Sequence, residues 1–176
     1  MILETERLRL RQYVPADAGA LFDVFSDPDA RAFYPAMADP ADVRRWIEWN
    51  LHNYDAFGLG LWAVELKTSG AFIGDCGLTY QDVEGLSTLE VGYHIVLHER
   101  RKGYATEAAR AGLEFGFVHT SGDEICSLVN PANLASRRVA ATIHQESRTI
   151  VSRGQDMLCF CTSRLAWAGR RGAPTR

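Results

Sequence analysis

Most of what this sequence reveals lies in Arg100-Arg101-Lys102-Gly103-Tyr104-Ala105-Thr106-Glu107-Ala108, where a basic run and a glycine lead directly into an alanine-rich segment with helical spacing. Gly103 lets the backbone come close to a ligand. The first amides of the following helix have no partners within the helix, and the helix dipole favours an anion at that end. The stretch therefore predicts a phosphate cradle, with Arg100, Arg101 and Lys102 adding positive charge at its mouth.

A plainer interpretation, a solvated basic turn that only opens a helix, stays open on these residues alone. The surrounding sequence favours the cradle. Residues 88–96 are typical of a strand just upstream, and Asn130-Pro131-Ala132-Asn133 follows a second strand downstream. Strand, glycine turn and helix in this order are what a pyrophosphate site requires, whereas GxxxxGK(S/T) and GxGxxG are absent, which disfavours a P-loop or a Rossmann site.

Length and composition indicate one globular domain over residues 1–167, followed by a flexible tail at 168–176. Hydrophobic residues make up 47% and charged residues 23% of the chain, as in ordinary soluble domains. A net charge of -3 argues against bulk nucleic-acid binding. The chain has no run of about 18 apolar residues and no signal-peptide pattern at its start, so we expect no membrane partner and a cytoplasmic location.

Metal binding is not expected from the cysteine and histidine spacing. His94 and His98 flank the end of a strand near the cradle, but no third ligand follows at a suitable spacing. The cysteines lack CxxC spacing and are predicted to be reduced thiols in the core; they are Cys76, Cys126, Cys159 and Cys161.

The order of predicted elements indicates an α+β (mixed α/β) fold, because an antiparallel meander precedes a strand, helix, strand, helix portion. Helices are predicted to open at 15–17, at Asp39 as N-cap before Pro40, after Gly103, and over 132–143. Thr68-Ser69-Gly70 is typical of a hairpin turn. The strands are predicted near 7–12, 61–67, 71–80, 88–96, 124–129, 148–151 and 157–161.

Several stretches in the same order carry a family resemblance over most of the chain: Thr5-Glu6-Arg7-Leu8-Arg9-Leu10-Arg11, Glu90-Val91-Gly92-Tyr93, Gly103 to Ala108, and Asn130 to Asn133 followed by Ser136 and Val139. Together with these stretches, the segment from Arg100 to Ala105 is similar to the pyrophosphate loop (Q/R)xxGx(G/A). The chain resembles the GNAT superfamily of acyl-CoA-dependent N-acetyltransferases, and within it the RimJ/RimL-like branch. The resemblance implies a central, mostly antiparallel mixed sheet, splayed between its fourth and fifth strands and flanked by about four helices.

The resemblance also implies how acetyl-CoA is held as co-substrate. Backbone amides of residues 102–105 would hold the pyrophosphate, the strand near Tyr93 would pair with the pantetheine arm, and Asn133 would contact that arm. The implied cofactor-binding residues are Tyr93, His94, Ile95, Arg100, Arg101, Lys102, Gly103, Tyr104, Ala105, Thr106 and Asn133.

Glu90 is the candidate catalytic base. Attack on a thioester needs a neutral amine, and a carboxylate on the strand that leads to the cradle can accept the ammonium proton. An ordinary charged strand residue, or a partner for Arg100, is the alternative for Glu90, and Asp75 on the neighbouring strand is a weaker rival.

Ser136 is the second candidate catalytic residue, because the resemblance places a donor to the departing sulfur at this position. A serine with this spacing also suits a helix surface. Tyr93 and Tyr104 are reserve donors, although packing in the core is the commoner role of such residues. Trp46 and Trp49 either line an acceptor pocket or fill the core, and residues 33–37 and 81–87 are expected to shape the acceptor side.

The sequence departs from the family pattern after residue 143, where a glycine is usual and Thr142-Ile143-His144-Gln145-Glu146-Ser147 has none. We expect this helix end to be strained or differently packed, which puts the register of the last two strands in doubt.

The expected reaction is transfer of an acetyl group from acetyl-CoA to a primary amine, either a protein N-terminal α-amine or a small amine. An α-amine titrates near 8 and a lysine amine near 10.4, so the α-amine demands less of a base. A non-catalytic acyl-CoA-binding module is the alternative function. RNA or ribosome contact through Arg170, Arg171 and Arg176 is a third and weaker one. The expected partner is the amine acceptor, and a homodimer is compatible with the sequence.

Overall fold

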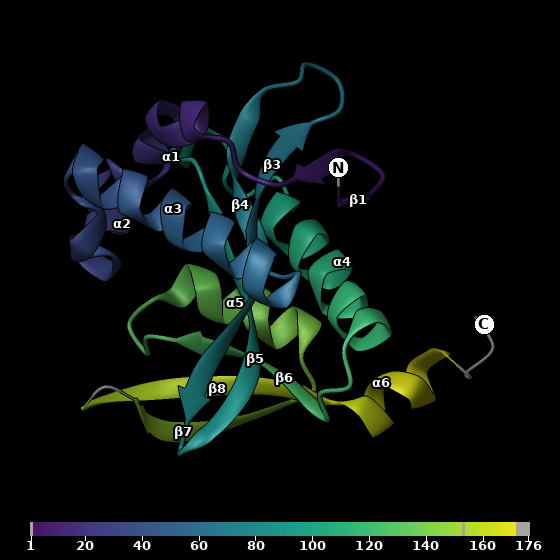
Figure 1. The fold of residues 1–176 in the computed structure, drawn as a ribbon. Coiled ribbons are helices and arrows are strands. Elements are labelled where there is room, and N and C mark those ends of the chain that lie inside the picture. Colours follow the sequence, from purple (N-terminus) through teal and green to yellow (C-terminus); the bar gives the residue numbers. More distant parts are fainter. Residues whose placement is uncertain (1, 153, 172–176) are drawn as a thin grey trace.

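The computed structural model describes residues 2–152 and 154–171 (Figure 1). One eight-stranded sheet has the order β1-β2-β3-β4-β5-β6-β8-β7. Its strands are β1 (Leu3–Glu4), β2 (Leu8–Arg11), β3 (Leu61–Leu66), β4 (Phe72–Val83), β5 (Leu86–Ile95), β6 (Glu124–Val129), β7 (Glu146–Ser152) and β8 (Gln155–Ser163). The helices are α1 (Ala18–Phe25), α2 (Pro28–Phe33), α3 (Pro40–Phe57), α4 (Tyr104–His119), α5 (Leu134–Ile143) and α6 (Arg164–Arg171), with short turns η1 (Pro15–Asp17), η2 (Pro35–Met37) and η3 (Leu97–Glu99).

The splay in the sheet lies between β5 and β6, as the resemblance implies for its fourth and fifth predicted strands. This is the one parallel pair within the described chain, and it registers only Leu89 with Ile125 and Glu90 with Cys126. β5 continues to Ile95 without β6 beside it, while its pairing with β4 extends from Leu86 to Ile95. The mixed, mostly antiparallel α+β fold is therefore confirmed, and one edge of β5 is left open.

Helices cover both faces of the central strands. α4 packs closely on one face because it carries glycine: a Cβ at Gly116 would lie 2.6 Å from Ile125 and 3.1 Å from Leu78. On the opposite face, Phe25 of α1 contacts the ring of His94 at 4.9 Å between ring centroids. Successive residues of β5 face opposite sides, so this strand contributes side chains to both layers.

The β4–β5 hairpin is longer than predicted. Residues 81–87, expected to be a loop, continue the two strands up to a turn at Glu84 and Gly85, whose φ angles are +55° and +83°. Positive φ at both central residues is the geometry that keeps two-residue hairpins twisted correctly. The hairpin reaches the β7–β8 hairpin at the bottom of the view in Figure 1, and the two share a small cavity. The predicted β3–β4 hairpin is confirmed, with Gly70 at φ +71°.

α2, a six-residue helix that follows Asp27, is not predicted by the sequence patterns. The Asp27 carboxylate accepts hydrogen bonds from the N–H groups of Asp29 and Ala30, and Pro28 occupies the first helical position. These are ordinary start signals, but the helix is too short to show a hydrophobic period. The N-cap at Asp39 that opens α3 is confirmed.

α5 ends without a left-handed residue. His144 is extended, at φ −98° and ψ 167°, and its ring lies between Ser127 and Thr162, with ring nitrogens 3.1 Å from both hydroxyls. The helix end is therefore packed through a buried side chain and no positive φ is needed there. β7 and β8 pair without a register shift, from Glu146 opposite Cys161 to Ser152 opposite Gln155, so the register is regular.

α6 overlaps the predicted tail, since residues 168–171 continue the helix. Arg164 anchors it by donating hydrogen bonds to the carbonyls of Phe117, Thr120 and Gly122, and Trp167 stacks on Phe117 at 5.1 Å. Residues 172–176 lie outside the described residues, as do the side chains of Arg170 and Arg171.

The four cysteines are free and buried, which confirms the prediction of core thiols. Three of them, Cys126, Cys159 and Cys161, form a small second core with Val83 and Ile150. Across residues 2–152 and 154–171, none of the helices combines the length and apolar character needed to cross a bilayer.

Candidate active site

Gly103 forms the start of α4 in a left-handed conformation, with φ +86°, two residues after Arg101 at φ +62°. The first hydrogen bond of the helix runs from the Glu107 N–H to the Gly103 carbonyl at 3.0 Å. The N–H groups of Tyr104, Ala105 and Thr106 precede it and point out of the helix end. A sixteen-residue helix aims its dipole at the same place, so this turn has the form of an anion cradle.

Arg7 from the far N-terminus holds the cradle in shape. Its guanidinium donates to the Lys102 carbonyl at 3.0 Å and to the Glu107 carboxylate at 2.6 Å, and it lies 4.5 Å from the centre of the Tyr104 ring. The Thr5 hydroxyl donates to the other Glu107 oxygen at 2.5 Å. Burial acts to raise the pKa of Glu107, but the hydrogen bonds from Thr5 and Arg7 outweigh it and lower the pKa.

The three basic residues of the cradle differ in what their side chains do. Arg100 donates to the Ile95 carbonyl at 2.8 Å and to Asp27 at 2.6 Å, so it ties the end of β5 to the start of α2. Lys102 pairs with Glu99 at 2.8 Å at the surface. Arg101 is exposed. The cradle therefore has less free positive side-chain charge at its mouth than predicted, because the Arg100 guanidinium is bonded to two other elements.

Between the cradle and the β5–β6 junction, Tyr93 presents its main-chain N–H and C=O to the open edge. The Val96 N–H donates to the Ile73 carbonyl of β4. The carbonyls of Val91 and Ile95 instead accept hydrogen bonds from the side chains of Ser127 and Arg100, on the side of β5 away from β4. Strand residues alternate in the direction of their main-chain groups, so Tyr93 faces away from β4, as Val91 and Ile95 do.

Two side chains close the gap beyond Tyr93. The Ser127 hydroxyl donates to the Val91 carbonyl at 2.8 Å, and the Glu90 carboxylate accepts the Leu128 N–H at 3.0 Å. These bonds replace the main-chain ladder where β5 and β6 separate. The predicted site residue Glu90 therefore lies at the closed end of the gap, where it also lines the cleft described next.

A cleft of about 830 Å³ opens over this part of β5. Its walls come from α2 and η2, α3, the β4–β5 hairpin, β6, α5 and the β7–β8 hairpin. Trp46 and Trp49 both line it, and residues 33–37 do so as expected, whereas only Gln81 of the 81–87 stretch does. The lining residues are Phe25, Phe33, Tyr34, Pro35, Ala36, Met37, Asp42, Arg45, Trp46, Trp49, Leu61, Thr79, Tyr80, Gln81, Glu90, Val91, Gly92, Tyr93, His94, Ser127, Leu128, Val129, Asn130, Asn133, Ser136, Ser152, Gln155 and Met157.

Ser136 and two tyrosines meet across the gap. The Tyr93 hydroxyl donates to the Ser136 carbonyl at 2.9 Å. The Ser136 side chain lies near Tyr34, where it acts to lower the pKa of that phenol. Asn133 is the N-cap of α5, accepting the Ser136 N–H at 3.0 Å. Burial raises the pKa of both tyrosines, and the nearby Glu90 charge adds to this, so both phenols stay protonated and can donate.

A second polar cluster lies under the cleft floor. Asp75 is fully buried, and its two carboxylate oxygens lie 2.6 Å from Nδ1 of His94 and 2.7 Å from the Tyr13 hydroxyl. Asp75 therefore does not reach the cleft, which removes it as a base acting directly on a substrate. His94, by contrast, lines the cleft next to Tyr34, with ring centroids 4.6 Å apart.

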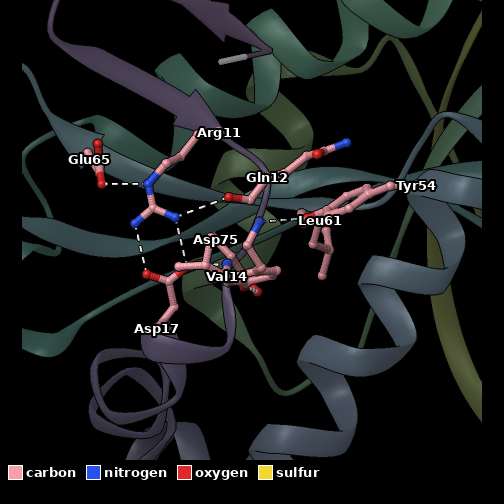
Figure 2. A network of polar contacts seen from close by, with 9 residues as sticks. Arg11, Gln12, Val14, Asp17, Tyr54, Leu61, Glu65 and Asp75 are labelled. Carbon is pink, nitrogen blue, oxygen red and sulfur yellow. Dashed lines mark hydrogen bonds and ion pairs between the residues drawn. The ribbon is translucent and has the colours of Figure 1, made fainter.

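A wider network holds the chain on either side of Tyr13, and Figure 2 shows its members Arg11, Asp17 and Glu65. Arg11 binds both oxygens of Asp17 at 2.7 and 2.8 Å and reaches Glu65 at 2.7 Å. The Tyr54 hydroxyl accepts the Tyr13 N–H at 3.3 Å. The backbone around Tyr13 is thus held from three elements, β3, η1 and α3.

The structure therefore brings together most of the predicted site residues along β5, the cradle and α5. It also gives contacts to Arg7, Glu107, Tyr13 and Tyr34 that the sequence did not predict. Local patterns could not reveal these contacts, because each joins residues that are distant in the chain. No group of three or more metal-ligating side chains lies together in the described residues.

Comparisons with known proteins agree with this geometry. A family model described as an acetyltransferase (GNAT) domain matches residues 7–145. The chain is 39% identical over 150 residues to the uncharacterised protein YkkB of Bacillus subtilis (strain 168), covering 84% of this chain and 87% of that protein.

Two solved structures share the fold. AAC(6')-Ib in complex with ribostamycin and coenzyme A has a TM-score of 0.80 at 16% identity, covering 96% of this chain and 100% of that one. A ribosomal-protein-S5-alanine acetyltransferase of Vibrio fischeri has a TM-score of 0.69 at 16% identity, covering 94% and 97%. These two acetyltransferases differ in what their names say they act on or bind, so the shared fold leaves the acceptor open.

Proposed function

This chain belongs to the family of GNAT-domain acetyltransferases, and from that membership we propose that it transfers the acetyl group of acetyl-CoA to a primary amine bound in the cleft over β5. One observation carries the proposal. The anion cradle at Gly103 and the open β5 edge at Tyr93 lie on one path that ends in the cleft.

The residues along this path fit coenzyme A. The outward N–H groups at the start of α4 suit a pyrophosphate, and the open edge of Tyr93 offers one donor and one acceptor to the amide groups of a pantetheine arm. The bonds at Val91 and Leu128 close the gap further along β5. The thioester end would therefore lie near Tyr93 and Ser136, where the cleft begins.

The co-substrate supplies an activated acyl group, and the protein supplies position and proton transfer. The Ser136 hydroxyl and the Tyr34 phenol both line the cleft, and we propose Ser136 as the donor to the departing sulfur. Glu90 and His94 are the two groups on the cleft floor that can accept the proton of the amine.

The acceptor is proposed as a single primary amine, either a protein N-terminal α-amine or a small amine. The motifs that resemble the RimJ/RimL-like branch favour the first. Seven aromatic side chains line the cleft beside two carboxylates, Asp42 and Glu90, of which Asp42 pairs with Arg45.

A non-catalytic acyl-CoA-binding module stays the alternative function, and a cytoplasmic location stays a prediction.

The test is thiol release from acetyl-CoA across a panel of peptide N-termini and small amines, together with calorimetry of coenzyme A binding. Turnover on at least one amine, and reduced turnover by Ser136→Ala, are the expected results. Binding of coenzyme A without turnover on any amine would favour the module. No binding of coenzyme A would overturn the proposal.

A further inference from the structure

We propose that His94 accepts the proton of the acceptor amine, and that Asp75 and Tyr13 are the positioning residues that orient its ring. The inference rests on the proposed function and deepens it, because it assigns the proton acceptor for the same reaction. It selects His94 over Glu90, the residue to which the sequence analysis gave this role.

The hydrogen-bond network determines which nitrogen of His94 is free. Burial, and next the charge of Asp75, raise the pKa of Tyr13 well above its ordinary value, so this phenol keeps its proton and donates it to Asp75. The other Asp75 oxygen then accepts from Nδ1 of His94 at 2.6 Å. A neutral imidazole that donates through Nδ1 has its lone pair on Nε2, which is the form a base requires.

The ring of His94 is held so that Nε2 is its polar atom available to the cleft. Phe25 and Tyr34 contact the ring at centroid distances of 4.9 and 4.6 Å, and Nδ1 points to the fully buried Asp75. The side chain is 13% exposed and lines the cleft. A histidine with one nitrogen fixed by a buried carboxylate and the other facing a cleft is oriented as in catalytic histidine–carboxylate pairs.

The position of His94 along β5 matches the expected position of the thioester. Tyr93, the adjacent residue, carries the open main-chain edge, and the gap is closed from Val91 onward by Ser127. Tyr34 lies between the two sides, because its ring contacts His94 and it lines the same cleft as Ser136. An amine that approaches the thioester from the cleft would therefore meet His94.

Glu90 is placed differently. It lies four residues earlier, roughly 13 Å along the strand at about 3.3 Å per residue, and its carboxylate accepts the Leu128 N–H of β6. This contact supports the junction of the two strands. Glu90 thus has a structural role at the closed end of the gap, whereas Asp75 and Tyr13 have no evident task other than to hold His94.

The charged and titratable groups around His94 come from every element packed against it. They are Tyr13 after β2, Asp75 on β4, Tyr34 after α2, Glu90 on β5, and the Arg100–Asp27 pair at the end of β5. Burial raises the pKa values of both tyrosines above the working range.

The proton balance is complete without a further reactant. The ammonium transfers one proton to Nε2 of His94, and the neutral nitrogen then forms the C–N bond as the C–S bond breaks. The nitrogen passes its second proton to the Ser136 oxygen as the Ser136 hydroxyl gives its own proton to the departing sulfur, so the amide and the free thiol form and Ser136 is unchanged. His94 returns its proton to water before the next turnover.

The test compares the pH dependence of kcat/KM for the wild type, His94→Gln, Asp75→Asn and Glu90→Gln, on an amine that the wild type acetylates. His52→Gln, on the exposed side of α3 and outside the cleft, is the matched control. His94→Gln is expected to lower kcat by roughly 10²–10⁴-fold, to leave the KM for acetyl-CoA within about threefold, and to remove the acidic limb of the profile. Asp75→Asn is expected to lower kcat and displace that limb, while Glu90→Gln and His52→Gln keep it.

A His94→Gln variant with the wild-type kcat and profile would overturn the inference, as would loss of the limb in Glu90→Gln alone. Tyr13→Phe keeps the ring and removes the hydroxyl donor, and it is the variant to use if Asp75→Asn does not fold. If the acidic limb of the kcat/KM profile is not shifted in Tyr13→Phe, Tyr13 is not a positioning residue. Measurement of coenzyme A binding and of turnover distinguishes failure of the His94 assignment from failure of the proposed function. A wild type that binds coenzyme A and acetylates an amine upholds the proposed function even where the role of His94 fails.

Discussion

The two ends of the path proposed for the co-substrate are built in opposite ways. At the cradle, one contiguous stretch supplies the glycine, the turn and the helix start, and main-chain N–H groups face the ligand position. At the reaction end, where the path enters the cleft, His94, Asp75, Tyr13 and Ser136 come from different elements, and His94, Asp75 and Tyr13 bond through their side chains. The cradle should therefore be sensitive to backbone conformation and tolerant of side-chain loss, and the reaction end should show the reverse.

The largest effect is expected at the reaction end, for Asp75→Ala. The change leaves the Tyr13 hydroxyl and Nδ1 of His94 unpaired in a buried site, which should lower the free energy of unfolding by about 3–5 kcal/mol. Urea denaturation followed by tryptophan fluorescence measures it. Tyr13→Phe, which removes one donor and keeps the ring, should lose only about 1 kcal/mol. A loss of less than about 1 kcal/mol for Asp75→Ala would mean that this cluster is not a unit.

The next largest effect is expected at the cradle, for Gly103→Val. A β-branched residue is strongly disfavoured at φ +86°, and the added Cβ would lie 3.3 Å from the Arg7 guanidinium. Distortion of the N–H groups should weaken coenzyme A binding by about 10–100-fold in calorimetry, equivalent to roughly 1.4–2.8 kcal/mol.

Gly85→Val is the matched control for this prediction. Gly85 has nearly the same φ, +83°, with nothing within 4 Å of the added Cβ, and it lies at the hairpin tip away from the cradle. It should lose stability but keep the affinity for coenzyme A. Equal affinity of the wild type and Gly103→Val would show that the cradle does not hold the pyrophosphate.

The same contrast explains what the sequence could predict. The Gly103 turn, the strand before it and the Asp39 cap all depend on neighbours within a few residues, so local patterns revealed them. α2 escaped detection because six residues are too few for a period, and residues 81–87 resembled a loop because Glu84 and Gly85 carry ordinary turn signals in the middle of a long hairpin.

The reaction end could not be assembled from the sequence, for a physical reason. Tyr13 and Asp75 are 62 residues apart and meet only when β2 and β4 are placed in one sheet. Arg7 and Glu107 are 100 residues apart. His94 and Asp75 were both noted, but their pairing depends on the β4–β5 register, which puts them opposite one another.

A smaller effect is expected for Glu107→Gln, which weakens the tie between the cradle and Arg7. At neutral pH the variant should be about 1 kcal/mol less stable, since the Arg7 side chain is partly solvent-exposed. The folded-state pKa of Glu107 is lowered from 4.5, so its carboxylate stabilises the folded protein above that pH and this contribution is lost as the pH falls below it. The difference between variant and wild type should therefore shrink in acid. Thermal unfolding at a series of pH values measures it, and a difference that stays constant into acid would contradict the assignment.

The smallest effect is expected for Lys102→Ala, and it is the sharpest test of how the cradle works. Lys102 pairs with Glu99 on the surface, and such pairs contribute between 0 and about 1 kcal/mol. If main-chain N–H groups hold the pyrophosphate, losing this side chain removes only a screened charge, and the KM for acetyl-CoA should rise less than about threefold at physiological salt. A rise above about tenfold would assign the binding to side-chain charge. Both ends of the path would then depend on side chains, and the tolerance expected of the cradle would be wrong.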